Sequence, residues 1–113
     1  MPKLKTLNLK RIVLTIDTPG QAKPISDTAI FVADFEFYMV AGNTGANMYM
    51  GDETVDNTWI PRPKGTSYKR TAGDGTFLGT DAKLGFDLSQ LYVDADEAGD
   101  TMIVEYVCGK LKG

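Results

Sequence analysis

The sequence predicts an all-β fold, an antiparallel sandwich or barrel of about seven or eight short strands. Three observations support this prediction. Apolar and polar residues alternate with a period of two in the longest segments. Turn signals recur roughly every 8 to 15 residues. The 113 residues also include 12 glycines and 5 prolines, more than a helical bundle would use.

The first expected strand covers residues 4–16. Apolar side chains lie on both of its sides, Leu7, Leu9 and Val13 on one and Ile12, Leu14 and Ile16 on the other. The polar pair Lys10-Arg11 interrupts the alternation, which predicts a bulge or a bend near Lys10. Residues 1–16 therefore form either the first strand of the domain or a strand-forming N-terminal arm.

The strongest strand pattern lies at 29–41. Period two places one set of side chains on a single face, namely Phe31, Ala33, Phe35, Phe37 and Met39. Asp34 and Glu36 fall on the opposite face. We expect a central strand whose phenylalanine face is part of the core.

The remaining elements are shorter. Strands are expected at 46–50, 58–60 and 66–71, and a further strand at 76–80 would complete a hairpin around the Ala72–Gly75 turn. Asp87 is expected to cap one helical turn before a strand at 91–94. The last strand, 101–111, places four side chains on its apolar face, namely Met102, Val104, Tyr106 and Cys108. No composition shift marks a boundary, so residues 1–113 are expected to form a single domain.

The composition excludes several classes of enzyme. With no histidine, the chain has no Ser-His-Asp triad, Cys-His dyad or histidine metal ligand. One cysteine excludes an intrachain disulfide and every Cys-x-x-Cys site. We therefore expect no catalytic activity, no cofactor and no metal. The rival hypothesis is an acid-base pair formed by Asp34 and Glu36.

The acidic segment 94–100 has alternating carboxylates of the kind that calcium sites use. It departs from the EF-hand loop, because Ala98 stands at the fifth position and both flanks have strand patterns. The favoured interpretation is a solvated hairpin turn.

The net charge of −3 is too small to indicate a nucleic-acid or membrane partner. No stretch approaches 18 consecutive apolar residues, so no transmembrane helix is expected. The segment after Met1 has no apolar core of a secretory signal. These features predict synthesis in the cytoplasm without processing.

Basic and aromatic residues gather around two prolines between residues 59 and 70. The candidate protein-interface residues in this region are Trp59, Arg62, Tyr68 and Arg70, types that often dominate binding energy. Lys3 and Lys5 extend the set, because an extended basic segment can add a strand to another sheet. The alternatives are a core tryptophan beneath a charged loop and, less favoured, a surface for single-stranded nucleic acid.

Two stretches resemble small virion structural proteins of tailed bacteriophages. The first is Asn43-Thr44-Gly45 leading into a strand that ends at Gly51-Asp52, followed by Trp59-Ile60-Pro61. The second runs from Leu88-Ser89-Gln90-Leu91-Tyr92-Val93 through Gly99-Asp100 to the closing strand with Val104 and Tyr106. The resemblance covers about residues 43 to 107, and its motifs are turn and strand motifs.

This resemblance narrows the fold to a single-domain antiparallel β-sandwich with a jelly-roll-like arrangement. It also implies a capsid decoration (cement) protein on the exterior of the virion, bound to the major capsid protein. Such proteins brace neighbouring capsomers and form homo-oligomers, so a dimer or trimer is expected. The alternative is a carbohydrate- or receptor-binding β module of a phage tail or fibre.

Overall fold

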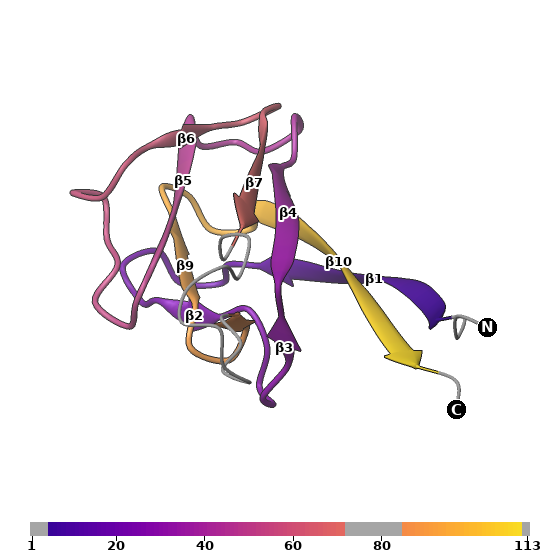
Figure 1. Ribbon diagram of the computed structural model, residues 1–113. Coiled ribbons are helices and arrows are strands. Elements are labelled where there is room, and N and C mark those ends of the chain that lie inside the picture. The colour runs from indigo at the N-terminus through magenta and orange to yellow at the C-terminus, as the bar shows by residue number, and fades with distance from the viewer. Residues whose placement is uncertain (1–4, 72–84, 112–113) are drawn as a thin grey trace.

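Two four-stranded antiparallel sheets face each other in the computed structural model, which describes residues 5–71 and 85–111 (Figure 1). At 5–7 and 108–111 only the backbone is described. Sheet A has the strand order β1 (Lys5–Thr15), β10 (Thr101–Leu111), β4 (Asp34–Met39) and β7 (Ser67–Thr71). Sheet B has the order β2 (Lys23–Pro24), β9 (Tyr92–Ala95), β5 (Asn47–Gly51) and β6 (Arg62–Pro63). A separate pair joins β3 (Phe31–Val32) to β8 (Phe86–Asp87).

The core lies between the two sheets. Sheet A contributes Leu14, Phe35, Phe37, Met39, Met102, Val104 and Tyr106, and sheet B contributes Met48, Met50, Val93 and Ala95. The ring of Phe35 packs edge-on against Phe86, with centroids 5.2 Å apart, so β8 closes one end of the core. Burying these side chains supplies the main stabilisation of the fold, at about 25 cal/mol per Å² of apolar surface.

The two longest strands form a ribbon that extends from the body. β1 and β10 pair without interruption from Lys5 opposite Leu111 to Thr15 opposite Thr101. The first and last described residues, Lys5 and Leu111, face each other at the far end of this ribbon (Figure 1). β4 pairs with residues 102–106 of β10, and within the described residues no strand pairs with the rest of the ribbon on that side.

The all-β antiparallel sandwich predicted from the sequence is confirmed, with ten strands among the described residues where seven or eight were expected. Four of the ten are two-residue pairings, which leave no period-two pattern to detect. A jelly-roll connectivity is not shown by this strand order and stays a prediction.

The predicted strand 29–41 is interrupted at Ala33. Phe35, Phe37 and Met39 are buried as expected, but Phe31 is 76% exposed and Val32 is buried in its place. The chain changes phase between β3 and β4, because the two strands pair with different partners, β8 and β10. The sequence does not reveal this break, because the segments on both sides of Ala33 contain apolar residues.

Three smaller expectations differ from the structure. The bulge near Lys10 is wrong, because every residue of β1 faces one residue of β10. The expected strand 58–60 is a turn, in which Trp59 N donates to Asp56 O at 3.1 Å. The expected helical turn after Asp87 is a hydrogen-bonded turn, in which the Asp87 carboxylate accepts from Ser89 N at 3.0 Å. The predicted strand 76–80 and its hairpin turn lie outside the described residues.

Within the part of the chain that the structure describes, no helix is long and apolar enough to cross a membrane.

Candidate interaction site

The face of sheet A that points away from the core is partly apolar, and no other described part of the chain covers it. On this outer face Leu9 is 69% exposed, Val13 56% and Val107 48%. Leu9 stands directly opposite Val107, and Val13 directly opposite Ile103. Directly opposed residues of antiparallel strands project to the same side, so these four side chains form two apolar rows across the ribbon.

A row of charges separates the two apolar rows. Across β1, β10, β4 and β7 the register aligns Arg11, Glu105, Glu36 and Lys69, so the charges follow the order plus, minus, minus, plus. All four side chains are exposed. Glu105 and Glu36 are direct neighbours, at about 5 Å between Cβ atoms, and like charges so placed are unfavourable. A cation brought to this pair by another molecule would relieve their repulsion.

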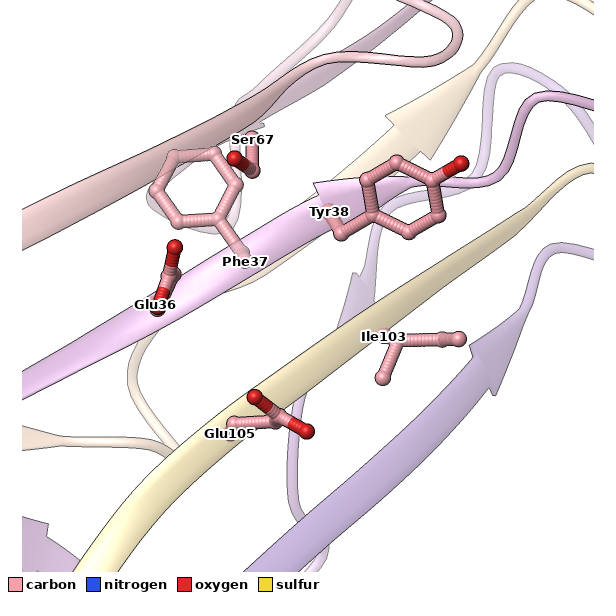
Figure 2. A pocket seen from close by; sticks show the side chains of 6 residues that line it. All are labelled: Glu36, Phe37, Tyr38, Ser67, Ile103 and Glu105. Atoms are coloured by element: carbon pink, nitrogen blue, oxygen red, sulfur yellow. The ribbon is translucent and has the colours of Figure 1, made fainter.

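A shallow hollow of about 310 Å³ lies over the centre of this face. Figure 2 shows its lining, with Glu36 and Tyr38 on β4 beside Ile103 and Glu105 on β10. Ser67 of β7 closes one side. The hollow therefore combines carboxylates with apolar carbon, which suits a cationic side chain with an alkyl stem.

Arg62, one of the predicted interface residues, is buried between the edges of the two sheets. Its guanidinium carbon lies 4.7 Å from the ring centre of Tyr68 and 5.4 Å from that of Phe37. Burial, followed by the nearby Arg70, lowers the pKa of Arg62. Its Nε is buried and has no hydrogen-bond partner within the described residues. Arg62 thus reaches from β6 of sheet B over Phe37 and Tyr68 of sheet A, and it closes the sandwich at this edge.

The other predicted interface residues are dispersed. Tyr68 is half-buried and stacks on Phe37, with ring centres 5.6 Å apart, whereas Arg70 on the same strand is exposed. Trp59 is 37% exposed and lies against Gly51, where an added Cβ would come 2.5 Å from its ring. Lys5 begins β1, its side chain lying outside the described part, and Lys3 is outside the described residues altogether. The structure brings Arg62, Tyr68 and Arg70 together, and the role of the whole set as an interface stays a prediction.

The acidic segment 94–100 is a solvated turn only in part. Glu97, Ala98 and Gly99 are exposed as expected, but Asp94 and Asp100 are buried, and the segment joins β9 of sheet B to β10 of sheet A, so it is not a hairpin. Asp100 is 1% exposed and accepts hydrogen bonds from Thr44 N at 2.9 Å and Gly45 N at 3.0 Å. Asn43 joins the same two turns, because its side chain accepts from Thr101 N at 2.9 Å and donates to Thr101 O at 3.1 Å. The motifs Asn43-Thr44-Gly45 and Gly99-Asp100 are therefore bound to each other.

The same segment fixes two further parts of the chain. Asp94 is 3% exposed and accepts from Gly20 N at 2.9 Å, which ties the loop after β1 to sheet B. Asp96 accepts from the Tyr49 hydroxyl at 2.8 Å and from Asn47 N at 3.2 Å. Burial of Tyr49, and then its hydrogen bond to Asp96, raise the pKa of Tyr49 to about 12. These carboxylates thus accept hydrogen bonds from N–H and O–H groups of the protein itself.

No group of three or more metal-ligating side chains gathers within the described residues. Asp34 and Glu36, the rival catalytic pair, both lie on β4. Asp34 is half-buried and Glu36 is exposed beside Glu105, the acid of the neighbouring strand. That the chain is not an enzyme stays a prediction.

A scan against protein-family models and a search of curated proteins found no match for this chain.

The exposed apolar face of sheet A was missed by the sequence reasoning, although a signal for it exists. A strand with apolar residues on both sides must either be covered on both sides or expose one of them. In β1 the side with Ile12 and Leu14 faces the core, and the side with Leu9 and Val13 faces outward. The sequence pattern alone does not say which side is uncovered.

Proposed function

We propose that the chain is a structural protein of a tailed-bacteriophage virion, in particular a decoration (cement) protein that binds the major capsid protein on the capsid exterior. The resemblance of residues 43–107 to such proteins supports this proposal. The observation that carries it is that the chain exposes apolar side chains at two separate places, Trp59-Ile60 and the outer face of sheet A with Leu9, Val13 and Val107, as a protein with two kinds of protein contact requires. Exposed apolar surface rimmed by polar residues is typical of protein–protein contacts.

Such a protein acts without catalysis, cofactor, nucleic acid or membrane. Each copy would add a modest contact, and repeated copies would brace neighbouring capsomers through multivalency. This requires one surface for the capsid and another for sister subunits, so the chain would be a dimer or trimer. The exposed pair Trp59-Ile60, at 37% and 65%, and the basic residue Arg70 supply the candidate capsid surface.

The test uses capsids assembled from the major capsid protein encoded in the same genome, prepared without this chain. We expect the purified chain to co-sediment with them at a fixed stoichiometry and to raise the melting temperature of the capsid. Trp59→Ala should weaken binding, whereas Gln90→Ala, at an exposed position before β9, should not. A wild-type chain that neither binds nor stabilises these capsids would exclude the proposal.

The second candidate is a glycan- or receptor-binding module of a tail or fibre, favoured by the exposure of Trp59. Tyr68 is engaged by Phe37 and Arg62, so Trp59 would be the main stacking residue. Binding on a glycan array that is lost in Trp59→Ala would favour this candidate. An array without signal, together with capsid binding, would favour the cement role.

A further inference from the structure

We propose that the outer face of sheet A is the contact between two copies of this chain, stacked face to face about a two-fold axis that runs along the strands. The inference rests on the homo-oligomer part of the proposed function and is independent of its virion part. It names the surface, the symmetry and the residue pairs of the contact.

The charged row is complementary to itself under this symmetry. Neighbouring strands are about 4.8 Å apart, and the order of charges from β1 to β7 is plus, minus, minus, plus. A two-fold axis between β1 and β10, about 3.6 Å from β1, places Arg11 of the second copy midway between Glu105 and Glu36. The same operation places Arg11 of the first copy between the two glutamates of the second. Each unfavourable glutamate pair thereby receives one guanidinium, which can bridge two carboxylates. The operation also brings Glu105 close to its own copy, about 2.4 Å away along the row, but four Arg11–glutamate pairs at the same offset outnumber this one repulsive pair.

The same operation also places each apolar row against the identical row of the second copy. Rotation about an axis along the strands leaves the height of each row unchanged, so the Leu9–Val107 row meets its own copy. The row with Val13, Ile103 and Tyr38 likewise meets its own copy on the other side of the charges. Stacked sheets prefer strand directions within about 30° of each other, which this arrangement satisfies.

Other pairings of two copies are opposed by charge. An axis across the strands would place Arg11 over Arg11 and glutamate over glutamate. Pairing of β1 with a second β1 along its free edge would bring together two strands that each carry Lys5, Lys10 and Arg11 with no acid. Lysines on an edge strand are a common protection against such edge pairing.

The contact is small. The two apolar rows and the charged row between them span about 14 Å along the strands. This is less than the extent of a standard interface, which buries about 800 Å² on each partner. We therefore expect a reversible dimer that accumulates as the protein concentration rises.

Complementary charge reversals test the arrangement by native mass spectrometry and sedimentation velocity. In a homodimer of Arg11→Glu, the introduced carboxylate lies between Glu105 and Glu36 of the other copy. In a homodimer of Glu36→Lys/Glu105→Lys, the two introduced ammonium groups lie beside Arg11 of the other copy. Each variant should lose affinity for itself by at least about tenfold, because like charges in a contact are costly. In an equimolar mixture both contacts become attractive, so the heterodimer should form.

Lys69→Glu is the matched control. It makes the same change of charge in the same row, but β7 lies outside the overlap of the two copies. It should leave dimerisation within about twofold of the wild type, since the remaining interaction with the second copy is screened by salt. Thermal unfolding of each variant, followed by circular dichroism, establishes that it is folded.

The proposal is overturned by a wild type that stays monomeric over the whole concentration range, by equal effects of Arg11→Glu and Lys69→Glu, or by a mixture without heterodimer. A dimer that depends on β1 but is unchanged by Glu36→Lys/Glu105→Lys would indicate edge pairing and also overturns it. A dimer with the expected charge dependence in a protein that binds no capsid would leave this inference intact and remove only the virion assignment.

Discussion

The two sheets differ in how far their outward faces are exposed to solvent. In sheet B the outward residues Tyr49 and Asp94 are 5% and 3% exposed, because the chain's own loops cover them. Gly20 N binds Asp94 at 2.9 Å, and the Trp59 ring lies against Gly51. In sheet A the corresponding outward residues Leu9 and Val107 are 69% and 48% exposed.

This difference separates the parts of the chain that stabilise the fold from the part available to another protein. Within the phage resemblance, the turn motifs Asn43-Thr44-Gly45 and Gly99-Asp100 bind each other through Asp100 and Asn43, whereas the closing strand with Val104 and Tyr106 is part of sheet A. The turn motifs therefore encode the fold, whereas the uncovered face of sheet A offers a surface for a partner. Substitutions on the two faces should consequently affect different measurements.

The largest expected effect is on the covered side. Asp100→Ala removes the acceptor of two backbone N–H groups, and Gly45 N among them is buried. We expect the free energy of unfolding to fall by about 3 kcal/mol, because buried donors left without partners are costly. Urea denaturation measures this. Asp17→Ala, at a side chain that is 83% exposed, is the control and should change the free energy by less than about 0.5 kcal/mol. Equal effects would contradict this role of Asp100.

Two glycines in the same turn sharpen this result. A Cβ at Gly45 would lie 2.5 Å from Asp100 Oδ2 and 2.9 Å from Asp96 Cβ, whereas at Gly42 nothing lies within 4 Å. Gly45→Ala should therefore cost about 2 kcal/mol through overpacking. Gly42→Ala, three residues earlier, should be nearly neutral. If both variants unfold at the same urea concentration, the close approach of the two turns is wrong.

The Tyr49 hydroxyl provides a pH-dependent test of the covered face. Tyr49→Phe removes the hydrogen bond to Asp96 and should cost about 1 kcal/mol at neutral pH. The pKa of Tyr49 is raised from 10.0 to about 12, chiefly by burial. Its contribution is therefore fully present below pH 10 and is lost as the pH rises from 10 to 12. The stability difference between wild type and variant should shrink over this range. A difference that is constant with pH would contradict the account, and the double variant with Asp96→Ala measures the coupling directly.

The smallest expected effect on folding is on the uncovered face. Leu9→Ser should change the free energy of unfolding of the monomer by only about 0.5 kcal/mol, because its side chain is already in contact with water. Val104→Ala on the inner face of β10, at 0% exposure, should cost about 2 kcal/mol. Denaturation at low protein concentration makes this comparison, and a Leu9 variant as damaging as the Val104 variant would show that the outer face is structural.

Much of the fold follows from period-two alternation, and the errors have physical causes. The alternation correctly identified Phe35, Phe37 and Met39 as core, and it gave the bounds of β10. It failed at Phe31, because pairing with a different strand reverses the phase without leaving a mark in an apolar sequence. It also failed at Asp94 and Asp100, because their burial depends on N–H donors from Gly20, Thr44 and Gly45, far away in the sequence.

The candidate site was less accessible to sequence reasoning. Arg62 and Tyr68 belong to residue types that dominate interfaces, yet Arg62 packs inside, at 9% exposure, over Phe37. The charged row exists only because the register aligns residues from four strands, one of them nearly one hundred positions from another. Register of that kind is fixed by tertiary pairing.

The measurement that tests the uncovered face most directly is sedimentation equilibrium of the wild type and of Leu9→Ser/Val13→Ser from about 1 μM to 1 mM, a range that covers weak and moderate affinities. We expect the wild type to shift from the mass of one chain to twice that mass and to do so less readily at high salt, which screens the charged row. The double variant should stay at the mass of one chain while remaining folded. A wild type that is monomeric throughout, or a variant that dimerises as readily as the wild type, would contradict the proposal that this face binds a second copy.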